Sequence, residues 1–430
     1  MKKIIWLIIV CMIIISGMFM YNKSDKKDLL EDSSGPIIAA VIDGKASTTF
    51  PTTNKYNASV ECTRNGKRID ANESITWNGT KWILTTAISD GNVRCNAIFR
   101  TLTFAETILA NNEVKAPITT PGAAISTADE ALLASAEDDN GTSYYFRGAV
   151  INNYVEFANK CWRIVRVGGD GSVKLILHND NTAGVANPCS SANNSTDAAF
   201  ARYSGDTFRS AFNTNKNDNA YIGFKYGTVG ASDYASAHAN INNSTILTNL
   251  ETWYNNNLKT YESVITDTVW CNDKANVTDT TYNPGGWSNV NGLGYGTNVT
   301  YYIVTQRLVS KSNSAGGTGP SLKCNGELSE ITSKVGLITA DELAFAGYAY
   351  GKNNTTTYLQ ENATSDYWWS LSPVVFDGGY AFVLDVSGGE GSFGIGFVFA
   401  AGVVRTSISL RSTTNVTGDG TSENPFIVET

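Results

Sequence analysis

The chain has 430 residues, which is enough for two or three folded units. Its formal net charge is −8 and only 17% of its residues are charged. Because nucleic-acid binders carry clustered Lys and Arg, the absence of a basic stretch in this sequence excludes nucleic acid as its main partner.

The chain begins with an unbroken apolar run over residues 4–21, followed by a charged segment over residues 22–34. A helix of that length crosses most of the hydrocarbon core of a bilayer. A cleaved secretory signal usually has a shorter apolar core and a small-x-small cleavage site. We therefore expect residues 4–21 to be an uncleaved single-pass transmembrane anchor and residues 22–34 to be a solvated stalk. A cleaved signal is the alternative.

Six cysteines follow the apolar run at wide spacing. They form no C-x-x-C motif and only two histidines accompany them, so a zinc site has little support. An even number of cysteines in an exported chain predicts disulfides and places most of the chain outside the cell. Six cysteines allow fifteen connectivities, and six buried free thiols are a further alternative. Pairing in chain order predicts Cys62–Cys95, Cys161–Cys189 and Cys271–Cys324.

Residues 35–104 predict a small β domain. X-Gly turns separate short β-branched and aromatic runs, as in hairpins. Cys62 and Cys95 fall in two of these runs, with Trp77 or Trp82 between them. This arrangement suggests an immunoglobulin-like β-sandwich. Residues 105–141 are rich in small and acidic residues and predict a linker. A short helix from Ala128 to Ala136, capped by Thr127, is expected within it.

Residues 142–430 predict one large α+β domain. Strands are expected over residues 144–147, 154–157, 161–167, 172–177, 367–372, 380–386 and 397–399. Apolar residues at helical spacing from Ile246 to Leu258 predict a helix capped by Ser244 or Thr245. Thr339 and Glu342 form a capping-box pattern at the start of a second helix. The long loops over residues 270–320 are bracketed by Cys271 and Cys324, whose disulfide would hold them.

Several motifs of this large domain resemble a family of uncharacterised, exported or membrane-anchored proteins of Gram-positive bacteria. The segments that carry the resemblance are residues 141–148 (GTSYYFRG), 161–166 (CWRIVR), 336–342 (GLITADE), 367–373 (YWWSLSP) and 404–410 (VRTSISL). The C-terminal pattern is also similar to C-type-lectin-like domains of formylglycine-generating-enzyme-like folds. Such domains often have Pro where this chain has Thr406. The resemblance implies a C-type-lectin-like fold in which first and last strands pair, and it implies binding rather than catalysis.

The motifs with catalytic potential have simpler structural interpretations. Residues 389–394 match G-x-G-x-x-G, but a strand-like run follows instead of a helix, so we expect a hairpin turn. His178 and His238 stand in no catalytic motif and are expected at the surface or in turns. A glycan hydrolase would need two carboxylates across a sugar site, and no spacing singles out a pair. The candidates are Asp341, Glu342, Asp366, Asp377, Asp385 and Glu390.

Aromatic residues interleaved with Ser, Gly and Asp crowd residues 367–399. Broad rigid rings beside small polar residues are typical of binding loops, although core packing is the alternative for each ring. Phe382 and Phe399 are expected in the core. No cofactor or metal is assigned: calcium is an alternative at residues 138–140 or around Asp377, but neither place matches a calcium-loop spacing. The predicted ligand-binding residues are Trp369, Phe376, Asp377, Tyr380, Glu390, Ser392, Phe393 and Phe397.

Together these features predict a membrane-anchored, extracellular ligand-binding or adhesion protein rather than an enzyme. Its partner would be an extracellular glycan or protein. A cell-envelope glycan hydrolase with paired carboxylates and an architectural surface protein without ligand are the alternatives.

Overall fold

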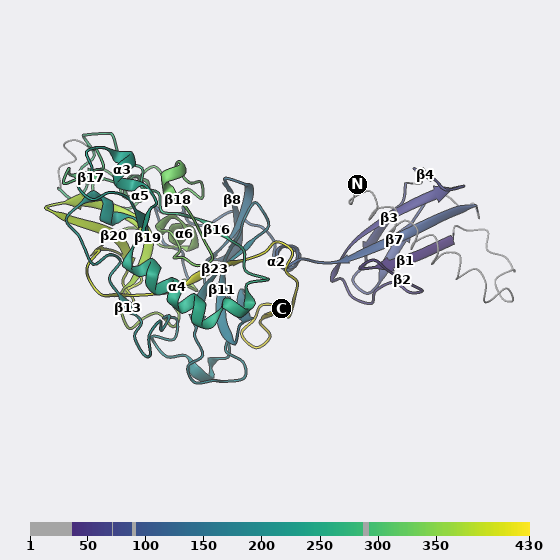
Figure 1. Ribbon diagram of the computed structural model, residues 1–430. Helices are drawn as coiled ribbons and strands as arrows, with labels where there is room; N and C mark the ends of the chain where they lie inside the picture. The colour runs from purple at the N-terminus through teal and green to yellow at the C-terminus, as the bar shows by residue number, and fades with distance from the viewer. Residues whose placement is uncertain (1–36, 71, 88–91, 287–291) are drawn as a thin grey trace. The chain divides into compact units, whose positions relative to one another are not determined.

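The protein is described by a computed structural model that covers residues 37–70, 72–87, 92–286 and 292–430. The chain divides into two compact units, one up to Leu102 and one from Thr103 to Thr430 (Figure 1). The predicted anchor and stalk, residues 4–34, lie outside the described residues. Within the described ranges, no helix is long and apolar enough to cross a bilayer.

Among its described residues, the smaller unit contains strands and no helix. A five-stranded sheet has the order β2-β1-β7-β3-β4, and β5 and β6 form a separate hairpin. Trp82 and Ile75 of that hairpin pack against Ala40, Ala97 and Phe99 of the sheet. The strands are β1 Ile37–Ile42, β2 Lys45–Ser47, β3 Tyr56–Arg64, β4 Lys67–Ile69, β5 Ser74–Trp77, β6 Trp82–Thr85 and β7 Val93–Thr101.

The predicted Cys62–Cys95 disulfide forms in this unit, but its position differs from the immunoglobulin pattern. Cys62 of β3 and Cys95 of β7 are directly opposite each other in one sheet. An immunoglobulin disulfide instead joins two facing sheets. The immunoglobulin-like prediction is therefore wrong in this respect, because the two cysteine-bearing strands are neighbours.

The larger unit is a sheet-rich α+β fold (Figure 1). Its helices are α2 Phe104–Asn111, α3 Tyr234–His238, α4 Thr245–Asn257, α5 Ile303–Leu308 and α6 Ala340–Ala346, with short 3-10 helices at Ser191–Asn193, Asn219–Ile222, Lys259–Tyr261 and Glu327–Ser329. Its strands are β8 Ala131–Asp138, β9 Gly141–Gly148, β10 Tyr154–Phe157, β11 Lys160–Val167, β12 Val173–Asn179, β13 Arg209–Ser210, β14 Lys225–Tyr226, β15 Asn242–Asn243, β16 Thr268–Cys271, β17 Thr300–Tyr301, β18 Glu330–Ser333, β19 Trp368–Asp377, β20 Tyr380–Val386, β21 Phe393–Phe397, β22 Gly402–Val403, β23 Ser407–Leu410, β24 Val416–Thr417 and β25 Phe426–Val428.

An eight-stranded sheet forms one part of the larger unit. Its main path is β23-β12-β11-β10-β25-β24, and β9 joins β11 to β8. Every residue of β12 is buried, so both faces of the sheet are covered at this strand. The early strand β10 pairs in parallel with β25, close to the end of the chain. The strands β9 to β12 fall where the sequence predicts them.

A six-stranded sheet carries the segment in which the ligand face was predicted. Its path is β13-β22-β19-β20-β21, with β17 on β19. β20 and β21 are antiparallel, and the glycine-rich residues 389–394 lead through the turn between them into β21. The hairpin interpretation of this motif is thus confirmed.

Residues 105–141 belong to the larger unit instead of forming a linker. Thr103 and Glu106 form a capping box at the start of α2. The predicted helix from Ala128 to Ala136 is also wrong, because β8 covers most of this range and pairs with β9 from Ala131 to Asp138. An Ala-rich run favours helix locally, but strand pairing overrides this weak preference.

The two helices predicted in the larger unit are confirmed. The Ser244 hydroxyl accepts a hydrogen bond from Leu247 N at 3.3 Å and caps α4. Trp253 of α4 packs edge-on against Trp162 of β11, with ring centroids 6.1 Å apart. The capping box of Thr339 and Glu342 starts α6. One continuous hydrophobic cluster runs from Phe104 to Val428 and joins both sheets.

Candidate functional site

The eight side chains predicted to bind ligand separate into a core group and a surface group. Trp369, Phe376 and Phe393 are buried in the main hydrophobic cluster. The indole Nε1 of Trp369 donates to the backbone oxygen of Ser210 at 2.8 Å. These three rings stabilise the fold and offer no surface to a ligand, contrary to the prediction.

The surface group lies at opposite ends of the β20–β21 hairpin. Exposed Glu390 and half-buried Ser392 lie in the turn before β21. Asp377 and Tyr380 face each other across the turn between β19 and β20, at the other end. Phe397 also lies at this second end, beside Phe382 on the neighbouring strand. About four residues of strand, or ~13 Å, separate the two ends. The structure therefore brings only Tyr380 and Phe397 together among the predicted rings.

Tyr380 and Phe397 are part of a larger cluster of exposed and half-buried side chains, which we call the aromatic patch: Tyr380, Phe397, Phe399 and Lys216. Ring centroids lie 5.3 Å apart for Tyr380 and Phe397, 5.4 Å for Phe397 and Phe399, and 6.1 Å for Tyr380 and Phe399. Phe397 is 41% exposed and Phe399 is 39% exposed. Aromatic pairs attract at these separations, so the rings support one another at the surface.

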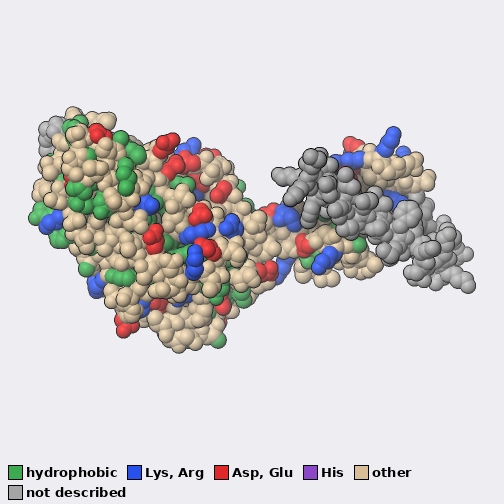
Figure 2. Space-filling model, viewed as in Figure 1, with side chains coloured by type: hydrophobic (Ala, Val, Ile, Leu, Met, Phe, Trp, Pro, Cys, Tyr) green, Lys and Arg blue, Asp and Glu red, His purple; other side chains and the backbone are tan. Residues whose placement is uncertain are grey.

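Backbone hydrogen bonds hold the aromatic patch together. Val398, between the two exposed Phe residues, is fully buried and its N–H donates to Ala381 O at 3.1 Å. Ala381 N in turn donates to Lys216 O at 2.8 Å. The loop that carries Lys216 is therefore fastened to β20. Figure 2 shows hydrophobic side chains gathered at the end of the larger unit where Figure 1 labels β17 and β20.

Sequence reasoning missed two members of the aromatic patch. Phe399 was expected in the core, but it follows the end of β21, where strand alternation no longer determines which way a side chain points. Lys216 lies far earlier in the chain, in an Asn- and Thr-rich segment without a recognisable motif. Only the fold brings its ammonium group to the rings.

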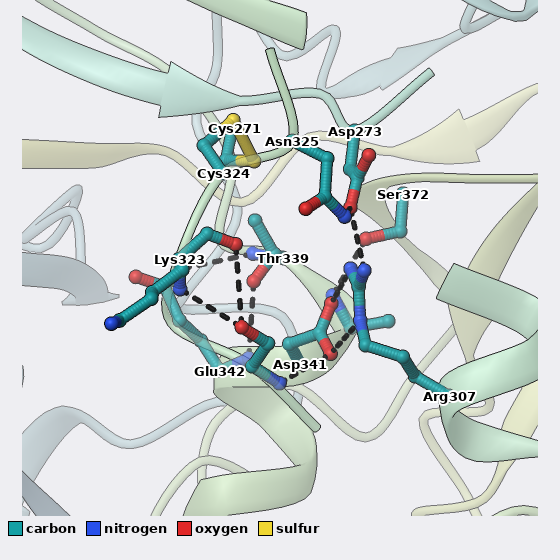
Figure 3. Close-up of polar contacts among 12 residues, drawn as sticks. Cys271, Asp273, Arg307, Lys323, Cys324, Asn325, Thr339, Asp341, Glu342 and Ser372 are labelled. Atoms are coloured by element: carbon teal, nitrogen blue, oxygen red, sulfur yellow. Dashed lines mark hydrogen bonds and ion pairs between the residues drawn. A yellow bond between two sulfur atoms is a disulfide. The ribbon is translucent and has the colours of Figure 1, made fainter. Parts of the chain in front are cut away.

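A second candidate site is a charged cavity of about 60 Å³ beside the Cys271–Cys324 disulfide (Figure 3). A space of that size holds a few water molecules and is too small for a sugar ring. Its charged lining residues are Asp138, Asp139, Asp341, Glu342, Arg166, Lys174, Arg307 and Lys323.

Ion pairs occupy the carboxylates that a hydrolase would need in this cavity. Arg307 binds both oxygens of Asp341, at 2.8 and 2.7 Å, and reaches Asp273 at 2.6 Å (Figure 3). Glu342 accepts from Arg166 at 2.9 Å and from Lys174 at 2.6 Å. Asp341 and Glu342 are thus each held by at least one cation.

The protonation of Glu342 also opposes a role as general acid. Burial alone would raise its pKa, but the charges of Lys174 and Arg166 outweigh burial and lower the pKa to about 2. A general acid must instead hold its proton near the working pH. Glu342 is therefore suited to ion pairing.

The same carboxylates hold the segment that carries Cys324 in place. Ser321 N donates to Asp341 and Cys324 N donates to Asp139, both at 2.9 Å. Asn325 Nδ2 donates to Asp273 at 2.9 Å. Together with the disulfide, these contacts hold residues 321–325 against α6, the turn between β8 and β9, and the segment after β16. The charged cavity therefore has a structural role, because its polar contacts hold this segment in place.

A more apolar cavity of about 260 Å³ lies elsewhere in the larger unit. Its wall includes residues of β17, α5, β19 and β21, which places it inside the six-stranded sheet region. Its lining residues are Pro284, Gly285, Tyr301, Thr305, Val309, Asn313, Tyr350, Val374 and Ile395. None of them is among the eight predicted ligand-binding residues.

The remaining hydrolase candidates do not form a pair. Asp366 is bound by Arg209. Asp385 is 7% exposed, and no hydrogen bond or ion pair joins its carboxyl to the other described residues; burial raises its pKa to about 7. Asp385 faces Trp369 across the strands.

The two histidines are buried, which corrects their expected surface positions. Burial lowers the pKa of His178 well below its ordinary value and that of His238 to about 3. Both are therefore neutral in the folded protein at physiological pH. In the part of the chain that the structure describes, no group of three His, Cys, Asp or Glu side chains is arranged to hold a metal ion.

The three disulfides are those expected from chain order: Cys62–Cys95, Cys161–Cys189 and Cys271–Cys324. They fit an extracellular protein, because disulfides persist in oxidising compartments. Comparisons with protein-family models, curated proteins and solved structures find no match to this chain.

Proposed function

We propose that this protein is anchored in the cell membrane through residues 4–21 and binds an extracellular ligand through the aromatic patch. The larger unit would present this patch on a C-type-lectin-like fold. The observation that carries the proposal is the exposure of Phe397 and Phe399 beside Tyr380. Large apolar side chains grouped at a surface mark interaction sites more often than single ones do.

A glycan or protein ligand fits this surface better than a small apolar molecule does. The aromatic patch lies on the surface, and exposed Asn215 and Asn217 flank its Lys216 in the sequence. Rings provide contact area at low entropic cost, while amides supply adaptable hydrogen bonds. Sugar rings and protein loops both use this combination.

The test is binding of the purified full-length protein to glycan and protein arrays, followed by measurement of Kd for the best hit. Phe397→Ser combined with Phe399→Ser should weaken binding at least about tenfold, because each ring contributes roughly 0.5–1.5 kcal/mol beyond its buried area. Because Phe397 and Phe399 are only 41% and 39% exposed, the double variant should melt at a somewhat lower temperature, and the Kd is measured where melting curves show both proteins to be folded.

Ile151→Ser is the matched control, because Ile151 is 73% exposed and lies outside the aromatic patch. It should leave the Kd unchanged. Equal affinity of the double variant and the wild type would contradict the proposal. An array without any hit would favour the architectural alternative. The hydrolase alternative receives no support from Asp341 and Glu342, since both carboxylates are engaged in ion pairs.

A further inference from the structure

Lys216 is the one cation of the aromatic patch, and its ammonium group lies close to two of the rings. Its Nζ lies 4.0 Å from the ring centroid of Phe399 and 4.4 Å from that of Tyr380. An ammonium group within about 6 Å of a ring face is attracted by the ring's quadrupole. The two rings thus hold the charge at the edge of the exposed cluster.

No carboxylate neutralises this charge within the described ranges of the chain. Asp377 lies across the turn from Tyr380, yet no ion pair joins Lys216 to Asp377 or to another described acidic residue. Contacts with rings leave an ammonium group able to attract an anion, because a ring carries no net charge. An unpaired cation beside exposed rings favours a ligand with both a ring face and a negative group.

The surroundings of Lys216 favour a sugar over an acidic peptide. Asn215 and Asn217, on either side of Lys216 in the sequence, are exposed. The Asn215 side chain hydrogen-bonds Tyr221, while the Asn217 amide can donate to and accept from hydroxyl groups, which a sugar presents around its whole ring. A peptide side chain offers few such groups.

Building on the proposed function, we propose that the aromatic patch binds an anionic sugar. The face of the sugar ring stacks on Phe397 or Phe399, and its carboxylate or sulfate group contacts the Lys216 ammonium. Asn217 binds a neighbouring hydroxyl group. Recognition is non-covalent and requires no cofactor.

The experiment uses the full-length protein and one oligosaccharide in neutral, sialylated and sulfated forms, together with a poly-glutamate peptide. Binding is measured for the wild type, Lys216→Gln, Lys216→Arg and Lys323→Gln. Lys323 lines the charged cavity and is not part of the aromatic patch, so it is the matched control for loss of one positive charge.

The wild type should bind at least one anionic form about three- to fivefold tighter than the neutral form, as expected for one exposed ion pair. Lys216→Gln should abolish this preference. Lys216→Arg and Lys323→Gln should keep the preference. High salt should reduce it, because salt screens an exposed pair. The sialylated and sulfated forms distinguish a carboxylate from a sulfate as the bound group.

Equal affinity for neutral and anionic forms in the wild type would overturn this inference and leave the proposed function intact. A preference that survives Lys216→Gln would overturn it as well. Binding of poly-glutamate in place of every sugar would assign the patch to an acidic peptide. Absence of binding to all arrayed sugars and proteins would overturn the proposed function itself. A melting temperature for each variant confirms that the fold is retained.

Discussion

Asp385 is a single buried residue whose ionisation should lower the stability of this fold. It lies on β20 opposite Trp369 of β19 and Gly394 of β21. A Cβ atom on Gly394 would lie 2.1 Å from one Asp385 carboxyl oxygen, and one on Gly396 would lie 2.4 Å from the Trp369 ring. The two glycines therefore leave the space that the Asp385 and Trp369 side chains occupy.

Replacement of Asp385 by Asn should stabilise the protein at pH 8 and have little effect at pH 4. Burial raises the pKa of Asp385 from 3.8 to about 7, so the folded state binds a proton that the unfolded state has released. The free energy of unfolding therefore falls as pH rises from about 4 to 7. Above that range, the loss of stability caused by ionised Asp385 stays constant. At pH 8 the variant should gain roughly 2–4 kcal/mol.

Urea unfolding of both proteins at pH 4, 6 and 8 checks this prediction. Tyr367 is a titratable neighbour, and burial together with the charge of Asp385 raises its pKa; it stays neutral over this range. A stability difference that does not vary with pH would show that Asp385 keeps an ordinary pKa.

At the scale of secondary-structure elements, local patterns predicted those parts whose stability is local. The caps Ser244 and Thr339 and the apolar spacing of α4 were readable because the interactions lie within a few residues. The strand β8 could not be predicted in this way, because the pairing of its eight residues with β9 outweighs the helix preference of its Ala-rich sequence.

The candidate site shows the same limit. The rings near residues 380–399 were visible in the sequence, but their burial was not. Phe376 and Phe397 have similar local patterns, yet Phe376 is fully buried and Phe397 is 41% exposed. Alternation along a strand shows which residues share a face, but it does not show which of the two faces other segments of the chain cover. Lys216 reaches the rings only through its backbone contact with β20.

The disulfide next to the charged cavity should contribute strongly to the stability of the larger unit. Replacing both Cys271 and Cys324 by Ser opens a loop with a sequence separation of 53 residues. In the chain-entropy model, closing such a loop stabilises the fold by about 4 kcal/mol. The double variant should therefore lower the melting temperature of the larger unit, measured by calorimetry.

The matched control is Cys62→Ser with Cys95→Ser, which removes the disulfide of the smaller unit. This variant should leave the melting temperature of the larger unit unchanged. If both double variants lowered that transition equally, the two units would not unfold independently.

At the scale of the whole molecule, the cysteines give the most direct test of location. The chain has seven cysteines, and all six after Cys11 are paired in disulfides. Protein taken from intact cells should therefore show no labelling at these six positions with a thiol reagent under denaturing, non-reducing conditions.

Labelling at all six positions should appear only after reduction, read by peptide mass spectrometry. Reduced thiols at these positions before reductant is added would place the protein in a reducing compartment. The extracellular proposal would then fail together with its ligand.

The first helix and the last strand of the larger unit lie in contact with each other. The rings of Phe104 at the start of α2 and Phe426 in β25 lie 5.3 Å apart, and Phe104 N donates to Thr414 O at 2.7 Å. Segments whose two ends are neighbours tolerate transplantation into surface loops of other proteins. This unit could thus be grafted as a cassette onto an unrelated carrier, with a short spacer at each junction and no stretching of its fold.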